Sequence, residues 1–363
     1  MKKISYAFIA ILMIFSACTE ESVEMGKPAH AGGPKDKDND GGGTDSGVTY
    51  YLTGSETDVQ TNTTAGYLLA GGSSDQKSWF DWMVGKSGGG DFVVIRSSNS
   101  SGYNDDTFIE GTNSIWTLVI DSREAANSEF VKEKIRNAEA LFIAGGDQTA
   151  YYDYWNDTEV EFAINYLVNE KKIPVGGTSA GLAILGEFAY IPQSSGVISS
   201  EALSDPYHSY MESLENDFLQ LPGLGSIVTD SHFSERDRLG RTITFMARLI
   251  QDGLVSDYQQ IKAIAVDEYT AAAIEANGDV SVLGDPDYED YAFFFSANSA
   301  PDVCEQGESL DWANAVNVYA IKGKNPPSVS FNIANWSAQS SDAVLHQVNV
   351  NNGSISNDIQ QPQ

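Results

Sequence analysis

The fold of this chain is decided by residues 173–184, which read IPVGGTSAGLAI. The apolar residues before the glycines predict a strand, and those after them predict the start of a helix. Ser179 stands at the turn between the two, where the N-terminal end of the helix favours negative charge. Gly177 and Gly181 flank this serine, and glycine accepts a sharp turn that a Cβ would obstruct. The pattern predicts a serine nucleophile, with an ordinary glycine-serine turn as the alternative.

A serine nucleophile needs a base, and the chain has four histidines. They are His30, His208, His232 and His346. His30 lies in a low-complexity stretch, and His346 lies in a polar C-terminal segment. His232 follows the β-type run 225–230, which puts it at the carboxyl end of a predicted strand, where catalytic groups gather in open α/β sheets. A structural histidine at a strand end is the alternative.

Three arginines follow His232 closely and begin a predicted helix. They are Arg236, Arg238 and Arg241. The cluster stands out because the chain has only 21 lysines and arginines against 51 aspartates and glutamates. Guanidinium groups suit carboxylate recognition, and cations at a helix start oppose its dipole. We therefore predict a carboxylate-binding role, with a solvated basic helix start as the alternative.

Apolar runs alternate with helical patterns along the middle of the chain. The predicted strands are 67–70, 92–95, 116–120, 141–144, 173–176, 226–230 and 263–267. Helical spacing recurs within 157–170 and again from Leu239 onward. This alternation predicts an α/β fold with a mostly parallel sheet and helices on both faces. The stretches 280–296 and 316–332 are β-like and predict a β-rich C-terminal extension of the sheet.

The N-terminal region has the pattern of an export signal. Lys2 and Lys3 precede an apolar run that ends in small residues before Cys18. This predicts a lipoprotein signal peptide over residues 1–17 and lipidation of Cys18, with an ordinary signal peptide or a short membrane anchor as alternatives. The predicted location is the periplasm or surface of a bacterium, where the lipid anchors the protein to a membrane.

Composition divides the rest of the chain. Residues 18–47 are predicted to form a flexible acidic and glycine-rich tether, and residues 48–335 a catalytic domain. Residues 336–363 are predicted to be a poorly ordered polar tail. Only Cys304 remains beside Cys18 after processing, so we expect no internal disulfide. The formal net charge of −30 opposes nucleic-acid binding.

Four blocks in order carry a family resemblance. They are AGGDQ at 144–148, GTSAG at 177–181, DSHF at 230–233 with the three arginines, and AVDEYTA at 265–271. Together they resemble the cyanophycinase-type members of the serine peptidase family that also includes aspartyl dipeptidase. The resemblance implies a flavodoxin-like fold similar to class I glutamine amidotransferases. One difference is Ser231, where cyanobacterial cyanophycinases usually carry glutamine.

The resemblance implies a catalytic triad. Ser179 would be the nucleophile, His232 the general base, and Glu268 the acid that orients the imidazole. Glu201 is the rival acid because it lies between the serine and the histidine in sequence.

The resemblance also implies groups that bind the reacting carbonyl and the substrate. The oxyanion hole would consist of backbone N–H groups of Ala180 and of the turn at Gly146 and Asp147. The substrate site would be lined by Gln148, Asp230, Arg236, Arg238 and Arg241.

The implied function is an exported serine hydrolase of peptide or isopeptide bonds next to aspartate. Cyanophycin-like substrates would release β-Asp-Arg, and neither a metal nor a cofactor is expected. One alternative is an aspartyl dipeptidase-like peptidase of other specificity, and another is a non-catalytic surface-binding lipoprotein. A homodimer is compatible with either.

Overall fold

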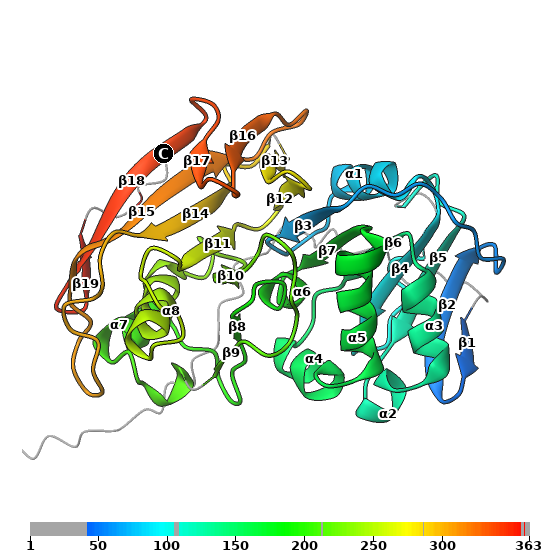
Figure 1. Cartoon of the computed structure of the whole chain (residues 1–363), viewed down its shortest axis with the longest axis horizontal. Helices are drawn as coiled ribbons and strands as arrows, with labels where there is room; N and C mark the ends of the chain where they lie inside the picture. Colours follow the sequence, from blue (N-terminus) through cyan, green and yellow to red (C-terminus); the bar gives the residue numbers. More distant parts are fainter. Residues whose placement is uncertain (1–41, 105–108, 212, 286, 357–358, 360–363) are drawn as a thin grey trace, which may run out of the picture. The chain divides into compact units, whose positions relative to one another are not determined.

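Five parallel strands form the middle of the largest sheet (Figure 1). The computed structural model describes residues 42–104, 109–211, 213–285, 287–356 and 359, all within the unit that spans residues 33–363. In spatial order the central strands are β5 (Ser114–Val119), β4 (Asp91–Arg96), β6 (Ala140–Ile143), β7 (Pro174–Thr178) and β3 (Gly66–Ala70). These strands are almost fully buried, as expected for parallel strands covered on both faces.

Antiparallel strands extend this sheet at both edges to eleven among the described residues. One edge carries β2 (Val48–Gly54) and β1 (Gly42–Asp45). The other carries β12 (Thr270–Glu275), β13 (Asp279–Gly284), β16 (Val329–Asn332) and β17 (Ser337–Ala338). The antiparallel neighbour of β3 is β12, so the parallel run ends at β3.

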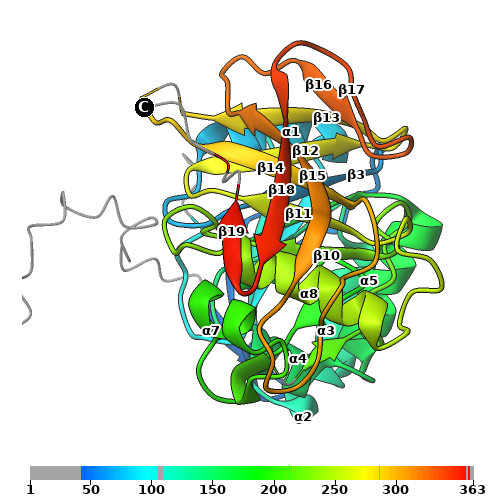
Figure 2. The same cartoon turned by 90° about the vertical axis from the view of Figure 1, so that its left-hand side faces the viewer.

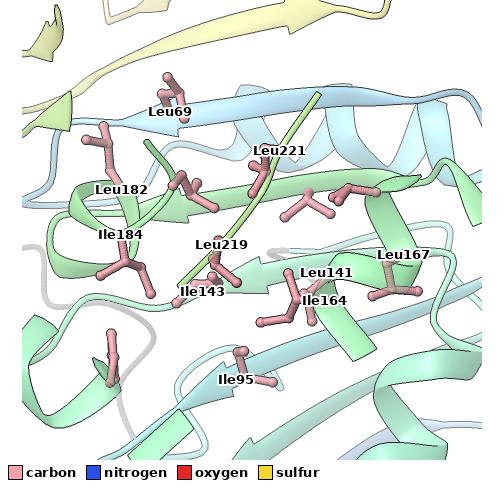
Figure 3. Close-up of a cluster of buried hydrophobic side chains, with 14 of the residues drawn as sticks. Leu69, Ile95, Leu141, Ile143, Ile164, Leu167, Leu182, Ile184, Leu219 and Leu221 are labelled. Atoms are coloured by element: carbon pink, nitrogen blue, oxygen red, sulfur yellow. The ribbon is translucent and has the colours of Figure 1, made fainter. Parts of the chain in front are cut away.

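Helices cover both faces of the large sheet because successive strand residues point to opposite sides. On one face α1 (Lys77–Ser87) packs against Phe92 and Phe142. The other face is covered by α2 (Arg123–Ala126), α3 (Glu129–Asn137), α4 (Gln148–Trp155), α5 (Glu159–Tyr166) and the π-helical turn Leu167–Lys171. Figure 3 shows this second cluster, in which Leu141 and Ile143 of β6 lie near Ile164 of α5.

A second sheet holds six strands in the described ranges. In spatial order they are β10 (Ile227–Asp230), β11 (Lys262–Val266), β14 (Tyr291–Ala297), β15 (Trp312–Lys322), β18 (Ala343–Asn351) and β19 (Ser354–Ser356). Only the pair β10 and β11 is parallel among these strands. Strands β14, β15 and β18 run side by side in Figure 2. One face packs against α7 (Ser199–Ser204) and the apolar side of α8 (Leu239–Gln251), and the other shares a core with the large sheet.

The remaining short elements connect these layers. They are α6 (Ala180–Ala183), β8 (Ala189–Tyr190), the 3-10 turn Ser209–Met211 and β9 (Leu214–Glu215). No helix within the described ranges has the length and apolarity that crossing a membrane requires. The predicted signal peptide and Cys18 lie outside the described residues.

The predicted α/β class and all seven predicted strands are confirmed, but their grouping differs in two ways. The strands at 226–230 and 263–267 belong to the second sheet, because β12 rather than β11 occupies the free edge of β3. The predicted C-terminal extension is divided between the two sheets. Strands β13 and β16 belong to the large sheet, whereas β14 and β15 belong to the second sheet.

The predicted poorly ordered tail is wrong for residues 337–356. Strand β18 pairs with β15, and its alternate residues Val348 and Val350 are buried in the core under α8. The many Asn, Ser and Gln residues around them hid this period-two pattern. The end of the predicted tether also differs, since β1 at 42–45 pairs with β2.

Candidate active site

Ser179 occupies a strained turn between β7 and α6. Its φ of 54° and ψ of −116° lie in a backbone region that residues other than glycine rarely adopt. A Cβ at Gly177 would lie 2.5 Å from the carbonyl carbon of Gly181, and one at Gly181 would lie 2.1 Å from the Ile143 carbonyl oxygen. Both glycines are therefore required by close backbone approach, and the turn leaves the Ser179 side chain partly exposed.

His232 lies against this serine although the two residues follow strands of different sheets. Its Nε2 is 2.7 Å from Ser179 Oγ, and its Nδ1 is 2.6 Å from Glu268 Oε1. The His232 backbone N–H donates to the Gly71 carbonyl oxygen at 2.8 Å, which joins the end of β10 to the end of β3. The side chains of His232 and Glu268 are 7% and 20% exposed, so this chain of hydrogen bonds is largely shielded from water.

Parallel pairing brings the histidine and the glutamate together. Strand β10 leads into His232 and strand β11 leads into Glu268, and Asp230 pairs in register with Ala265. Because the carboxyl ends of parallel strands meet at one edge, the residues that follow them become neighbours. The Glu268 backbone N–H is itself held by Glu235 Oε1 at 3.1 Å.

The environment keeps the imidazole neutral. Burial lowers the pKa of His232 below its ordinary value, and the nearby Arg236 and Arg238 lower it further, while the Glu268 carboxylate acts in the opposite direction. A neutral imidazole that accepts from a serine hydroxyl at Nε2 carries its proton on Nδ1, facing the carboxylate. The arrangement can therefore remove the Ser179 proton and stabilise the imidazolium that results.

The turn between β6 and α4 lies beside the serine. A Cβ at Gly145 would be 3.5 Å from the Cβ of Ser179. Asp147 caps α4, since its Oδ1 accepts the backbone N–H groups of Thr149 and Ala150 at 2.9 and 3.4 Å. Ala180 is the first residue of α6, where a backbone N–H has no partner within the helix. Ala180 thus follows Ser179 directly, and the turn that contains Gly146 and Asp147 lies next to Ser179 at Gly145, while their role as an oxyanion hole stays a prediction.

Two of the predicted arginines form ion pairs with the buried Asp230. Asp230 is 2% exposed, and it accepts Arg241 Nε at 2.8 Å, Arg241 Nη2 at 2.5 Å and Arg238 Nη1 at 3.1 Å. Thr242 Oγ1 adds a fourth donor at 3.0 Å. These contacts leave Asp230 and Arg241 buried, so neither is placed to contact a substrate. Arg238 is partly exposed and lines a pocket with Phe233 and Ser234, and its role in the substrate site stays a prediction. A buried carboxylate needs several donors, and the start of α8 supplies them internally.

Arg236 differs from the other two arginines. It is exposed, no ion pair to it is found among the described residues, and its charge acts on His232. Its backbone N–H donates to the His232 carbonyl at 3.1 Å. Gln148, also predicted for the substrate site, donates from Nε2 to the Tyr190 carbonyl at 2.7 Å. Of the three predicted arginines, Arg236 is the most exposed, and its charge acts on the triad histidine.

The rival acid Glu201 is wrong as the partner of His232. Its carboxylate accepts the backbone N–H of Ile198 at 3.1 Å, at the start of α7, while Glu268 contacts the imidazole. Position between serine and histidine in sequence carried no information about which acid lies near the histidine in space.

One acidic cluster could hold a cation. Carboxylate oxygens of Glu235, Asp267 and Asp290 lie within 4.8 Å of one another, the only such group that the described part of the chain contains. Burial raises the pKa of Asp267 to about 7 and that of Asp290 to about 7. Asp267 also accepts the backbone N–H groups of Ser234 and Tyr291 at 2.8 and 2.9 Å. Its two oxygens thus already tie the His232 loop to β14.

Sequence reasoning missed two residues that shape the site. Gly72 has a φ of 117°, and a Cβ there would lie 2.3 Å from His232 Cε1, so only glycine leaves room for the imidazole. Glu235 holds the Glu268 backbone. The glycine pair directly after the strand at 67–70 was a signal for the first, while Glu235 had no distinguishing sequence pattern.

The fold and this site define a serine-type peptidase class, in which a serine on a strand-to-helix turn contacts a histidine held by a carboxylate. Comparison with known proteins agrees, since residues 112–204 match Peptidase family S51. The resemblance to this family is confirmed over that segment, which contains Ser179 and the Gly145–Gly146 turn and ends before His232.

Two cyanophycinases are similar to this chain. The one from Nostoc sp. is 29% identical over 177 residues, which cover 48% of this chain and 52% of that protein. The one from Synechococcus elongatus is 28% identical, with 48% of each chain covered. The chain thus spans about half the length of the curated relatives it matches. Among solved structures, a peptidase from an acI-B1 Actinobacterium is 16% identical with a TM-score of 0.46, covering 62% of this chain and 90% of that one.

Proposed function

We propose that this chain is an exported serine peptidase that hydrolyses peptide or isopeptide bonds next to aspartate, in the manner of a cyanophycinase. The hydrogen-bonded series Ser179, His232 and Glu268, with contacts of 2.7 and 2.6 Å, is the observation that supports hydrolysis most directly. The similarity to cyanophycinases supports the substrate class.

The chemistry follows from the contacts. His232 Nε2 takes the Ser179 hydroxyl proton as Oγ attacks the substrate carbonyl carbon. The N–H groups of Ala180 and Gly146 donate to the oxyanion that develops on the carbonyl oxygen. His232 then gives its proton to the leaving amine. In deacylation His232 takes a proton from water, the resulting hydroxide attacks the acyl carbon, and His232 returns the proton to Ser179 Oγ. Glu268 stays ionised and stabilises the imidazolium throughout.

Hydrolysis is tested by product analysis. The purified protein is incubated with cyanophycin and with β-linked aspartyl dipeptides, beside Ser179→Ala and the surface variant Ser256→Ala. We expect β-Asp-Arg from cyanophycin, a loss on the order of 10⁴ in turnover for Ser179→Ala, and no loss for Ser256→Ala. Cleavage of dipeptides alone would favour an aspartyl dipeptidase-like specificity. No hydrolysis of any substrate would favour a non-catalytic binding protein.

Arg236 is the proposed carboxylate-binding group of the substrate site. Its guanidinium is exposed beside His232, and a planar fork recognises a carboxylate better than lysine does. Arg236→Lys should therefore raise KM for a β-linked Asp-Arg substrate while a neutral peptide is unaffected. Equal loss on both peptides would mean that Arg236 acts on the triad and not on the substrate.

Export by a lipid anchor on Cys18 is also a proposal, carried by the N-terminal sequence pattern. Cys18→Ser should release the protein from the membrane fraction or block its processing. Each CH₂ of an acyl chain that is buried in the bilayer contributes about 0.8 kcal/mol to membrane binding, and this variant would lose that contribution. Unchanged membrane retention of Cys18→Ser would indicate an uncleaved N-terminal segment instead.

A further inference from the structure

Tyr151 lies directly beneath the turn that borders Ser179. It is fully buried on α4, and its hydroxyl lies 2.9 Å from the Ala144 carbonyl oxygen and 3.2 Å from the Gly145 carbonyl oxygen. A Cβ at Gly146 would lie 2.5 Å from the same hydroxyl. The phenol oxygen therefore contacts three consecutive residues of the turn from its buried side.

The planar trans peptide bond links the direction of the Gly145 carbonyl to that of the Gly146 N–H. In a trans peptide the C=O of one residue and the N–H of the next point to opposite sides. The Gly145 carbonyl shares the single Tyr151 O–H with the nearer Ala144 carbonyl. Because the Gly145 carbonyl points to this buried hydroxyl, the Gly146 N–H points away from the core. Gly146 is exposed on that outer side, and Gly145 lies next to Ser179.

We propose that Tyr151 is a positioning residue that aims the Gly146 N–H at the oxyanion formed on Ser179. The inference rests on the proposed function and names a residue that acts through the oxyanion hole without touching the substrate. Burial raises the pKa of the Tyr151 phenol, so the group is a hydrogen-bond donor at neutral pH. A carbonyl that a neutral donor holds cannot rotate freely, which keeps the N–H aimed before substrate arrives.

The ring of Tyr151 has a separate structural role. It stacks on Trp155 with centroids 4.3 Å apart and planes 11° apart. Tyr151→Phe keeps that stack and removes only the hydroxyl, so it separates positioning from packing. A matched control is Tyr152→Phe, which removes the hydroxyl of the next residue, bonded to Asp217 Oδ1 at 2.8 Å away from the turn.

The test compares turnover with the binding of a tetrahedral adduct. For Tyr151→Phe we expect kcat to fall about tenfold, less than the loss of a whole oxyanion donor, with KM unchanged. An N-acyl aspartyl boronic acid forms a tetrahedral adduct on serine, and its inhibition constant should rise by the same factor. Tyr152→Phe should change neither quantity.

A second variant tests the same contact from the other side. Gly146→Ala would push its Cβ against the Tyr151 hydroxyl and displace the turn, lowering kcat. In the combined variant with Tyr151→Phe this clash is relieved, so the combined loss should be smaller than the product of the two single losses. Gly146→Ala keeps Tyr151 intact, so it still probes the contact if Tyr151→Phe alone folds poorly.

Three results would overturn the proposal. They are a kcat of Tyr151→Phe within about twofold of wild type, an unchanged boronic acid constant despite a lower kcat, and fully multiplicative losses in the combined variant. Failure of the proposed function is distinguishable, because the wild-type protein would then show no hydrolysis that depends on Ser179.

Discussion

Replacing Glu268 by glutamine tests the triad most sharply, because the change removes a charge and retains the shape. Glu268 Oε1 lies 2.6 Å from His232 Nδ1, and both side chains are largely shielded from water. Loss of the carboxylate charge in a triad costs on the order of 10⁴ in kcat. Glu268 is 20% exposed, so water replaces part of its effect, and we expect a loss nearer 10³, or about 4 kcal/mol of activation free energy.

The assay is steady-state hydrolysis of a β-linked Asp-Arg substrate from pH 4 to 9, with circular dichroism to confirm folding. Glu201→Gln is the matched control, because it removes a partly buried carboxylate that caps a helix backbone instead of the imidazole. We expect that control to retain wild-type kcat. The acid limb of the pH profile of kcat/KM should also shift to lower pH in Glu268→Gln, since the carboxylate raises the pKa of His232.

A loss below about tenfold in Glu268→Gln would refute the assignment of Glu268 as the group that orients the base. Equal losses in Glu268→Gln and Glu201→Gln would instead point to a general effect of negative charge near the site.

Three further predictions concern pH, packing and charge. Because burial lowers the pKa of His232, the neutral base persists to lower pH, and kcat/KM should fall only as the pH drops well below 6.5; a midpoint at or above 6.5 would contradict the shift. Gly177→Ala should cost about 1–3 kcal/mol of unfolding free energy because its Cβ would meet backbone at 2.5 Å, whereas Gly85→Ala, with nothing within 4 Å, should gain about 0.5–1 kcal/mol in thermal melts. Asp230→Asn should destabilise by about 3 kcal/mol in urea unfolding because it leaves buried arginine charge uncompensated, while the exposed Asp45→Asn should be neutral. Because the pKa of Asp230 is lowered in the folded protein, this stabilisation is present at neutral pH and is lost as the pH falls through that folded pKa, which lies below 3.8. An unfolding free energy that does not depend on pH in this range would argue against the ion pair.

The central strands could be read from the sequence because they are buried on both faces. A continuous apolar run marks such a strand whatever its neighbours are, and all seven predicted runs are strands. Strand β18 was missed because its inward residues, Val348 and Val350, stand among polar residues. Edge and antiparallel strands show only alternate apolar positions, which a polar composition conceals.

The turn at Ser179 was equally local. Its apolar flanks, glycines and serine all lie within residues 173–184, although the close approach that demands Gly181 is to the Ile143 carbonyl oxygen of β6. The segment alone left an ordinary glycine-serine turn as the alternative, and the other sequence blocks favoured a nucleophile.

The partners of the serine were decided by tertiary structure. With 51 acids in the chain, the residues alone could not tell Glu268 from Glu201. The choice depends on β10 and β11 pairing in parallel, which brings the residues after both strands to one edge. Likewise, the arginines after His232 form one sequence cluster, yet Arg241 in the first turn of α8 is buried against Asp230 and Arg238 at the N-cap pairs with the same carboxylate, while Arg236 stays exposed. Sequence therefore determined which residues can do the chemistry, whereas strand pairing and helix direction, which depend on contacts between distant segments, determined which of them meet.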